Sequence, residues 1–213
     1  MKSLMILGAT GAVGQALLAL ALERPSIKHV IAPTRKALPT HPKLLNPIVD
    51  FEHLPHEASW WQCDAIICAL GTTIKQAGSK EAFEKIDHDY VIHAARLAKD
   101  AGTPCFIYNS SMGANEASRS FYLHIKGKIE HHLNELGFDA TYHFRPSLLI
   151  APNREEFRLG ERLGVWLMSV FAFVIPKNYR AIHVSCVAKA MLQHALSPQK
   201  GRYIIESSHI KGS

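Results

Sequence analysis

The sequence predicts an α/β protein in which a doubly wound parallel sheet lies between two layers of helices. Short apolar runs alternate with longer segments of helical periodicity, a pattern typical of parallel strands that are buried on both faces. The chain has 213 residues, of which 47% are hydrophobic, and this suits one sizeable core but is short for two. A glycine-rich turn joins the first apolar run to the first helical segment. We therefore expect a single three-layer α/β/α domain over residues 1–213.

The glycine turn spans residues 8–14 and follows the apolar run 4–7 with the spacing G-x-x-G-x-x-G. Without a Cβ atom the backbone can approach a pyrophosphate closely, and the start of the next helix directs unpaired N–H groups and a partial positive charge toward it. We expect a nucleotide here, although a purely steric turn would have the same composition. The residues expected at the phosphates are Gly8, Thr10, Gly11, Ala12, Val13 and Gly14.

A basic pair follows the second expected strand. The first helix, 12–23, is ended by Pro25, and the second strand, 28–32, leads into Arg35 and Lys36. In a dinucleotide-binding fold an acidic residue near this point accepts a hydrogen bond from the ribose 2′-hydroxyl. Arg35 could instead bind a 2′-phosphate through two parallel hydrogen bonds, and Lys36 could add a point charge. The pair favours NADP(H), and solvated loop charges are the alternative.

The third strand is expected over 48–51, after a proline-studded loop over 39–47. Its end would lie near an adenine in a dinucleotide-binding sheet. Asp50 could accept a hydrogen bond from the exocyclic amine, and Phe51 could pack beside the ring. Asp50 could equally cap the next turn, so both interpretations stay open.

The fourth strand lies within 64–73 and runs into a glycine–threonine turn, which belongs to the cofactor crevice because it follows the carboxyl end of a strand. The longest helix begins at Ser79 and is closed by Gly102. Its apolar stripe is predicted to be core and not a site. The stripe consists of Phe83, Ile86, Tyr90, Ala94 and Leu97.

The fifth strand, 104–109, brings Ser110 and Ser111 to its carboxyl end, and the next helix carries Tyr122 and Lys126. Residues four apart are neighbours on one side of a helix. A nearby ammonium stabilises a phenolate and lowers the pKa of a phenol. Tyr122 could then move a proton to or from a substrate oxygen that a serine hydroxyl holds in place. An ordinary core tyrosine is the alternative.

A sixth strand is expected over 140–145, and the tail from 202 to 206 is a candidate seventh, which gives the strand order 3-2-1-4-5-6 with an extension. The apolar run 165–175 is half the length of about 20 residues that a membrane helix needs. We expect a buried helix there, with a pocket wall, a dimer contact or a membrane-surface contact as alternatives. The segment at about 151–180 should shape the substrate side of the site.

These motifs resemble those of the short-chain dehydrogenase/reductases, and the match covers nearly the whole chain. The glycine spacing is that of extended and atypical members, and further segments resemble the atypical branch that contains the Tat-interacting oxidoreductases. These segments are 68–73, 75–78, 87–91, 110–114, 122–126 and 144–146. The resemblance implies a Rossmann-type fold that binds NAD(P).

The resemblance also implies roles for individual residues. Ser111 matches the catalytic serine better than Ser110, because it directly precedes the turn, and Tyr122 and Lys126 would hold the nicotinamide ribose and act on substrate. Residues 69–72 replace the Asn-Asn-Ala-Gly of the core family, which leaves the proton-relay asparagine without a counterpart. Besides Tyr122 and Lys126, the cofactor contacts expected from the resemblance are Gly8, Gly11, Gly14, Arg35, Leu70, Gly71, Thr72 and Pro146.

The composition narrows the possible functions. The net charge is +6 with scattered lysines and arginines, which favours an enzyme with an anionic cofactor over a nucleic-acid-binding surface. The four cysteines lack C-x-x-C spacing and indicate a reduced cytoplasmic protein. Histidines lack metal-binding spacing, so no metal is expected, and His183 is a candidate for a position near the cleft.

We therefore expect an NADP(H)-dependent oxidoreductase, a monomer or homodimer, that acts on a small carbonyl or alcohol. In this prediction Tyr122 is the acid/base, Lys126 tunes it and Ser111 anchors the substrate oxygen. Two alternatives remain: an NADPH-binding regulatory or redox-sensor protein that acts through protein partners, and an epimerase or dehydratase that uses the same trio.

Overall fold

A seven-stranded parallel sheet forms the centre of the part of the chain that the computed structural model describes, residues 2–151 and 180–210. The strand order is β3-β2-β1-β4-β5-β6-β9, which confirms the predicted order and the predicted seventh strand. The strands are β1 (Lys2–Leu7), β2 (Ile27–Ile31), β3 (Leu44–Leu45), β4 (Ala65–Cys68), β5 (Cys105–Asn109), β6 (Ala140–Arg145) and β9 (Gly201–Glu206). A separate pair is formed by β7 (Leu149–Ile150) and β8 (Ile182–His183).

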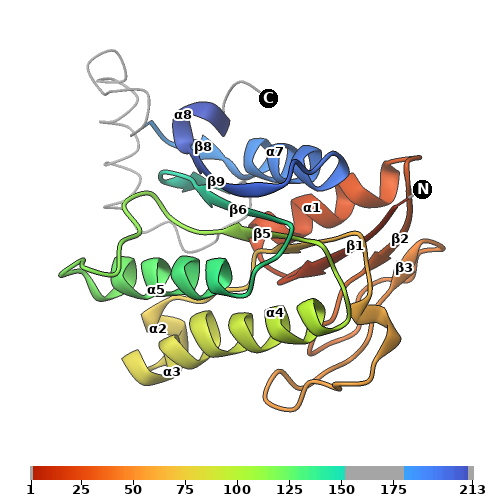
Figure 1. The fold of residues 1–213 in the computed structure, drawn as a ribbon, viewed down its shortest axis with the longest axis horizontal. Coiled ribbons are helices and arrows are strands. Elements are labelled where there is room, and N and C mark those ends of the chain that lie inside the picture. The colour runs from red at the N-terminus through yellow and green to blue at the C-terminus, as the bar shows by residue number, and fades with distance from the viewer. Residues whose placement is uncertain (1, 152–179, 211–213) are drawn as a thin grey trace.

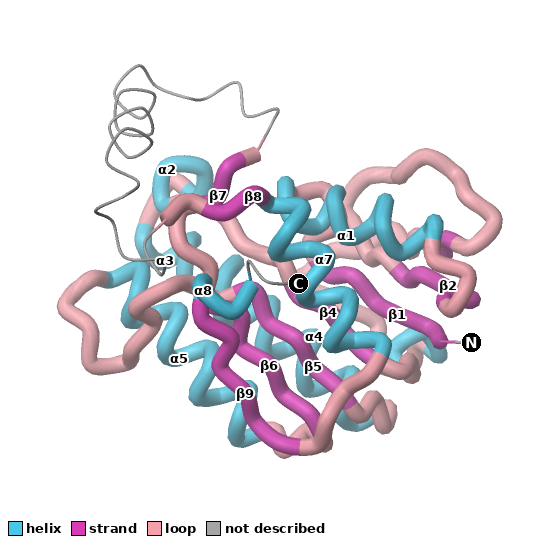
Figure 2. The backbone as a smooth tube through the Cα atoms, turned by 90° about the horizontal axis from the view of Figure 1, so that it is seen from above, coloured by secondary structure: helices cyan, strands magenta, loops and turns pink. Residues whose placement is uncertain are grey.

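Helices cover both faces of this sheet, which completes the predicted three layers (Figures 1 and 2). One face carries α1 (Ala12–Glu23) and α7 (Val184–Leu196), and the other carries α4 (Tyr90–Asp100) and α5 (Phe121–Glu135). Shorter helices are α2 (Ile74–Ala77), α3 (Lys80–Glu84), α8 (Ser207–Ile210) and the single turn η1 (Ser59–Trp61).

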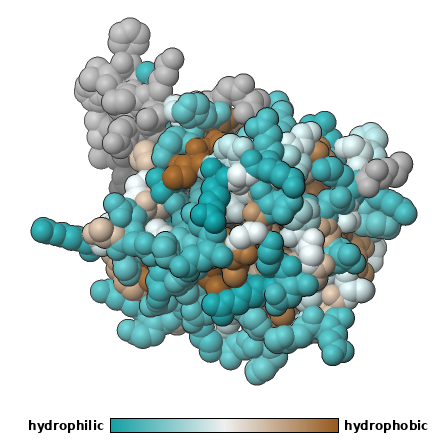
Figure 3. Space-filling view, viewed as in Figure 1, coloured by the Kyte–Doolittle hydropathy of each residue, from teal (hydrophilic) through white to brown (hydrophobic). Residues whose placement is uncertain are grey.

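The alternation of side chains along each strand supplies both halves of the core. In β1, Leu4 and Ile6 pack with the residues of α1 and α7, whereas Met5 and Leu7 pack with those of α4 and α5. All four side chains are fully buried, as expected for a parallel strand covered on both sides. On the outside, Figure 3 shows a mostly hydrophilic face with apolar side chains in small, separate patches.

The third strand differs from the prediction. It consists of residues 44–45, inside the expected loop, and Ile48 makes only an isolated bridge with Thr34. The ladder is interrupted because Pro47 has no N–H group to donate. The side chain of Asn46 instead donates to the carbonyl of Ala32 and accepts from the N–H of Leu38. Asp50 then folds the chain into a turn by accepting a hydrogen bond from the N–H of Glu52.

The longest helix begins where predicted, with Ser79 accepting a hydrogen bond from the N–H of Ala82, and it closes at Gly102, whose φ is +85°. It is not one regular helix, because the π-helical turn η2 (Lys85–Asp89) separates α3 from α4. A π turn holds more residues per turn than an α-helix and is frequent at functional sites. Here it places Asp87 and His88 in buried positions.

The predicted substrate-side segment and its apolar run 165–175 lie almost wholly outside the described residues. Within the described ranges, no helix has both the length and the apolar character needed to cross a membrane.

His143 on β6 makes the stability of the fold dependent on pH. It is 1% exposed, its Nε2 lies 2.9 Å from Asn134 Oδ1, and burial lowers the pKa of His143 to about 4. The unfolded chain, with an ordinary histidine pKa of about 6.5, binds more protons between these values. We expect this group to contribute about 3 kcal/mol to the free energy of unfolding at neutral pH, lost as the pH falls from about 6.5 to about 4.

Urea unfolding of wild type and His143→Gln between pH 7 and pH 4.5 measures this contribution. The variant should lose less stability over that range than wild type, whereas substitution of the exposed His29 should leave the dependence unchanged. Identical pH dependences in His143→Gln and wild type would contradict the assignment.

Candidate functional site

The structure gives different reasons for the presence of glycine at the three positions of the first turn. Gly8 has a φ of +83°, and a Cβ atom there would lie 2.6 Å from the backbone of Ala69. A Cβ atom on Gly14 would overlap the carbonyl of Gly8, so both glycines are required by packing alone. Gly11 is different, because in the described part of the chain its added Cβ would have no neighbour closer than 3.4 Å. The space next to exposed Gly11 is therefore open to an approaching phosphate.

The start of α1 suits an anion. Gly11 is the N-cap residue and has no side chain with which to cap the helix, so the N–H groups of the first turn remain available. Two hydrogen bonds shape the turn, from the N–H of Gly11 to the carbonyl of Gly8 and from the side chain of Gln15 to the carbonyl of Thr10. The residues present fit the pyrophosphate of a dinucleotide.

Hydrogen bonds from the side chains of Thr34 and Asn46 fix the loop that carries Arg35 and Lys36. Thr34 Oγ1 donates to the carbonyl of Lys36 at 2.7 Å. Asn46 Nδ2 donates both to Thr34 Oγ1 at 2.7 Å and to the carbonyl of Ala32 at 2.6 Å. Arg35 and Lys36 themselves are exposed. Asn46 is a positioning residue that the sequence did not reveal, since an asparagine in a proline-studded loop is an ordinary turn residue.

Asp50 and Phe51 already have protein partners. Asp50 accepts a hydrogen bond from the N–H of Glu52 at 3.0 Å, and its carboxylate lies 2.9 Å from His53 Nδ1. These two hydrogen bonds lower the pKa of Asp50, and the bond from Glu52 has the larger effect. Phe51 is buried and stacks on Tyr90, with ring centroids 5.9 Å apart. The contact of Asp50 and Phe51 with an adenine stays a prediction.

The chemical centre of the site is the buried ammonium of Lys126 on α5. Its Nζ lies 2.9 Å from Asp87 Oδ2 and 3.0 Å from the hydroxyl of Tyr108. Asp87 also accepts from the N–H of Thr72 at 2.7 Å. Burial opposes the charge, but Tyr108 and Asp87 outweigh it and raise the pKa of Lys126 well above its ordinary value. The lysine is therefore a fixed cation at neutral pH.

Tyr122 lies next to this cation, as the four-residue spacing predicts. Its ring centroid is 5.7 Å from Lys126 Nζ, and its side chain packs against Phe83 with centroids 6.0 Å apart. Tyr122 is 37% exposed, so it can meet a ligand from solvent. Within the described residues its hydroxyl forms no hydrogen bond with Lys126, whose contacts are made with Asp87 and Tyr108.

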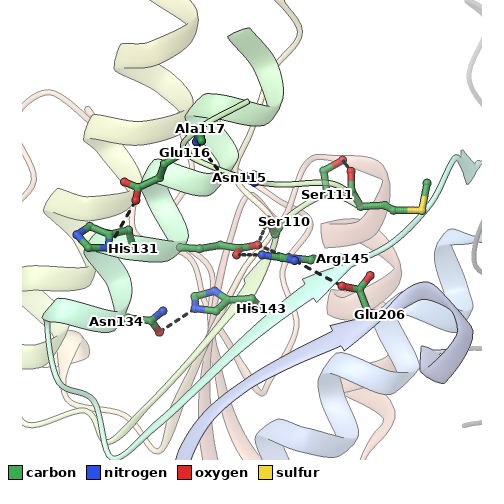
Figure 4. A network of polar contacts seen from close by, with 12 residues as sticks. Ser110, Ser111, Asn115, Glu116, Ala117, His131, Asn134, His143, Arg145 and Glu206 are labelled. Atoms are coloured by element: carbon green, nitrogen blue, oxygen red, sulfur yellow. Dashed lines mark hydrogen bonds and ion pairs between the residues drawn. The ribbon is translucent and has the colours of Figure 1, made fainter. Parts of the chain in front are cut away.

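The two serines at the end of β5 have separate environments (Figure 4). Ser110 is buried and donates to Glu130 Oε1 at 2.5 Å. Ser111 is half-buried, and among the described residues its hydroxyl makes only a long 3.4 Å contact with the carbonyl of Met112. Ser111 is thus the serine whose hydroxyl remains available, which supports its selection over Ser110. Pro146 is buried on the adjacent strand end and accepts from the N–H of Met112.

Asp87 and Tyr108 are site residues that the sequence analysis missed. Phe83, Ala94 and Leu97 of the predicted stripe are buried, whereas Ile86 and Tyr90 are half-buried and the π turn η2 brings the neighbouring Asp87 inward. Gly71 permits this approach, because a Cβ atom there would lie 3.3 Å from Asp87 Oδ2. The available signal was an acidic residue directly beside an apolar stripe.

Other predicted or conspicuous features lie outside this centre. His183 is exposed and contacts Ser185 at the start of α7, with Nδ1 2.6 Å from the serine Oγ. A hollow of about 240 Å³ lies between the end of α7 and β9, lined by residues such as Tyr142 and Tyr203, and includes none of the predicted site residues. In the described ranges, no three histidine, cysteine or acidic side chains are grouped as a metal site requires.

Sequence comparisons support the dinucleotide interpretation of this site. A family model described as NAD(P)H-binding matches residues 8–163. Protein HTATIP2 of Rattus norvegicus is 37% identical over 209 residues, covering 94% of this chain and 84% of the relative. The protein named FMP52, mitochondrial, of Candida albicans is 32% identical over 218 residues, covering 95% of this chain and 93% of the relative.

Solved structures show the same fold at low identity. MoeE5 in complex with UDP-glucose and NAD has a TM-score of 0.74 at 15% identity and covers 95% of this chain and 74% of its own. The human epimerase family protein SDR39U1 with NADPH has a TM-score of 0.60 at 17% identity, with 97% and 77% covered. The fold is thus the Rossmann-like α/β fold, and the chain belongs to the NAD(P)H-binding family of atypical short-chain dehydrogenase/reductases.

Proposed function

We propose that the protein is an NADP(H)-dependent oxidoreductase that interconverts a carbonyl and an alcohol. The observation that carries this proposal is the buried Lys126 ammonium, fixed by Asp87 and Tyr108 beside the accessible ring of Tyr122. A structural lysine needs no partly exposed phenol next to it, whereas an acid/base tyrosine needs both the cation and access to substrate.

In this proposal Lys126, Tyr122 and Ser111 have separate roles. Two of the three N–H donors of Lys126 are occupied by Asp87 and Tyr108, which leaves one for a ribose hydroxyl or the phenol. Tyr122 lies beside this cation and is partly exposed, so it would give or take the proton at the substrate oxygen. The Ser111 hydroxyl would hold that oxygen, and the bound cofactor would supply or accept the hydride.

The choice of NADP(H) over NAD(H) rests on Arg35 and Lys36, which follow β2 without an acidic neighbour in the loop. Asn46 and Thr34 hold the loop in shape, so that less side-chain and loop ordering is required when a phosphate binds.

We also propose that the protein is cytoplasmic, because Cys63, Cys68 and Cys105 are buried free thiols, as is usual in a reducing compartment. The FMP52 relatives are named mitochondrial.

Gly11 and Gly14 provide a matched test of the phosphate site. The free energy of unfolding of Gly11→Ala should lie within about 1 kcal/mol of the wild-type value, since alanine is only a weaker N-cap residue. Its affinity for NADPH should fall at least about tenfold, because the added methyl group lies in the path of the phosphates. Gly14→Ala should instead lose about 1–3 kcal/mol of stability from overlap with Gly8. Urea unfolding and nicotinamide fluorescence titration measure both, and unchanged NADPH affinity in Gly11→Ala would overturn this site.

Arg35→Ala tests the cofactor preference. Loss of a two-point charged hydrogen bond should weaken NADPH binding by about 1.5–3 kcal/mol, which is roughly tenfold to a hundredfold, and leave NADH binding unchanged. Calorimetric titration with both cofactors measures the difference, and Arg24→Ala, on the far side of β2, is the control. Equal affinity of wild type for NADPH and NADH would refute the role of Arg35.

Tyr122→Phe tests catalysis. Removal of the hydroxyl should lower kcat by about 10²–10⁴-fold with a panel of aldehydes and ketones, while NADPH affinity stays within a factor of about three, since one lost hydrogen bond contributes little. The nicotinamide absorbance reports turnover. Undiminished activity in the variant would exclude this role for Tyr122. Tight NADPH binding without turnover in wild type would favour the regulatory alternative.

A further inference from the structure

Glu130 is a buried carboxylate one helical turn beyond Lys126, and the function proposed above does not use it. Its residue is 5% exposed. Arg145 binds it at two points, with Nε 3.0 Å from Oε1 and Nη2 2.6 Å from Oε2. Ser110 donates to the same Oε1 at 2.5 Å. A buried carboxylate with two charged contacts and one hydroxyl contact is a rigid point, because all of its strong partners are already present.

These contacts join the carboxyl ends of two neighbouring strands next to the candidate site. Ser110 directly follows β5 and Arg145 ends β6 (Figure 4), and Glu130 on α5 contacts both of them. Backbone hydrogen bonds reinforce the junction, from Ser110 N to the carbonyl of Phe144 at 2.7 Å and from Met112 N to the carbonyl of Pro146 at 3.0 Å. The short segment between these two bonds contains Ser111.

The direction of the two serine side chains follows from this anchor. Successive side chains along an extended chain point to opposite sides. Because Ser110 is bound toward Glu130, Ser111 is directed away from it. Within residues 2–151 and 180–210, the Ser111 hydroxyl has only a 3.4 Å contact with the carbonyl of Met112. The orientation of Ser111 is thus set by its neighbours and not by its own contacts.

We propose that Glu130 is a positioning residue that, through Ser110 and Arg145, holds the Ser110–Met112 segment so that the Ser111 hydroxyl faces the substrate. The inference rests on the proposed function, in which Ser111 binds the substrate oxygen.

The same network offers a matched control in Glu206 on β9. It meets Arg145 at a single, longer distance of 3.5 Å, and its side chain is 37% exposed, compared with 7% for Glu130. Such a solvent-exposed pair contributes little. Glu206→Gln therefore removes one charge from the network but leaves the Ser110 anchor in place.

Hydrogen exchange of backbone amides tests the inference without substrate or cofactor. In Glu130→Gln, one side-chain oxygen must serve both Ser110 and Arg145, so the amide of Met112 should exchange at least about tenfold faster than in wild type, while the central amides of β4 keep their rates. Ser110→Ala removes only the serine contact, should fold normally, and should show the same local effect. Glu206→Gln should exchange like wild type.

An unchanged rate at Met112 in both Glu130→Gln and Ser110→Ala would overturn the proposal. So would a uniform increase over β4, β5 and β6 in both variants, because that pattern reports global destabilisation and not local positioning.

Kinetics with a carbonyl substrate supply the functional readout. Glu130→Gln should lower kcat about tenfold or more, as small displacements of a positioning group do, with the KM for NADPH unchanged and Glu206→Gln near wild type. Faster exchange at Met112 with unaltered kcat would contradict the link to Ser111. Absence of turnover in wild type would remove the proposed function, and the exchange data alone would then decide whether Glu130 anchors the segment.

Discussion

The site depends on the buried ion pair between Lys126 and Asp87. Two charges out of water are stable together only if most of their remaining hydrogen-bonding capacity is also met, and here the N–H of Thr72 binds Asp87 and the hydroxyl of Tyr108 binds Lys126. These groups come from the turn after β4, from η2, from β5 and from α5. The pair therefore forms only when four segments, distant in sequence, have assembled correctly, and it fixes them relative to one another.

Much of the architecture follows from local patterns in the sequence. Apolar runs of strand length separated by helices are enough to predict a covered parallel sheet, and the sheet order follows from the connections that such units make. The predicted bounds of the third strand were wrong. Ile48 and Val49 have high strand propensity, but the regular ladder is limited to Leu44 and Leu45, and beyond it the side chain of Asn46 donates to the carbonyl of Ala32 and only an isolated bridge joins Ile48 to Thr34. Side-chain hydrogen bonds to a distant backbone leave no periodic trace in a sequence.

The candidate site was predictable where its geometry is local and was missed where it is not. Tyr122 and Lys126 are neighbours because they are four residues apart on α5. The partners of Lys126 and the role of Glu130 depend on which helix face meets which strand. A lysine or glutamate in a helix is ordinarily solvated, so its burial becomes visible only with the tertiary structure. The π turn was missed because the apolar residues between 83 and 97 also fit the period of one regular helix.

The π turn η2 connects the site to the core in a way that limits how this chain can change. One extra residue in a turn rotates everything after it by about 100° relative to a regular helix. The same rotation that brings Asp87 inward also sets which face of α4 meets the sheet, and Val91, Ala94 and Ala98 are fully buried on that face. A deletion that restored regular helix in η2 would displace these side chains together with Asp87. The length of η2 is therefore constrained jointly by packing and by electrostatics, because a single-residue insertion or deletion within it would alter both.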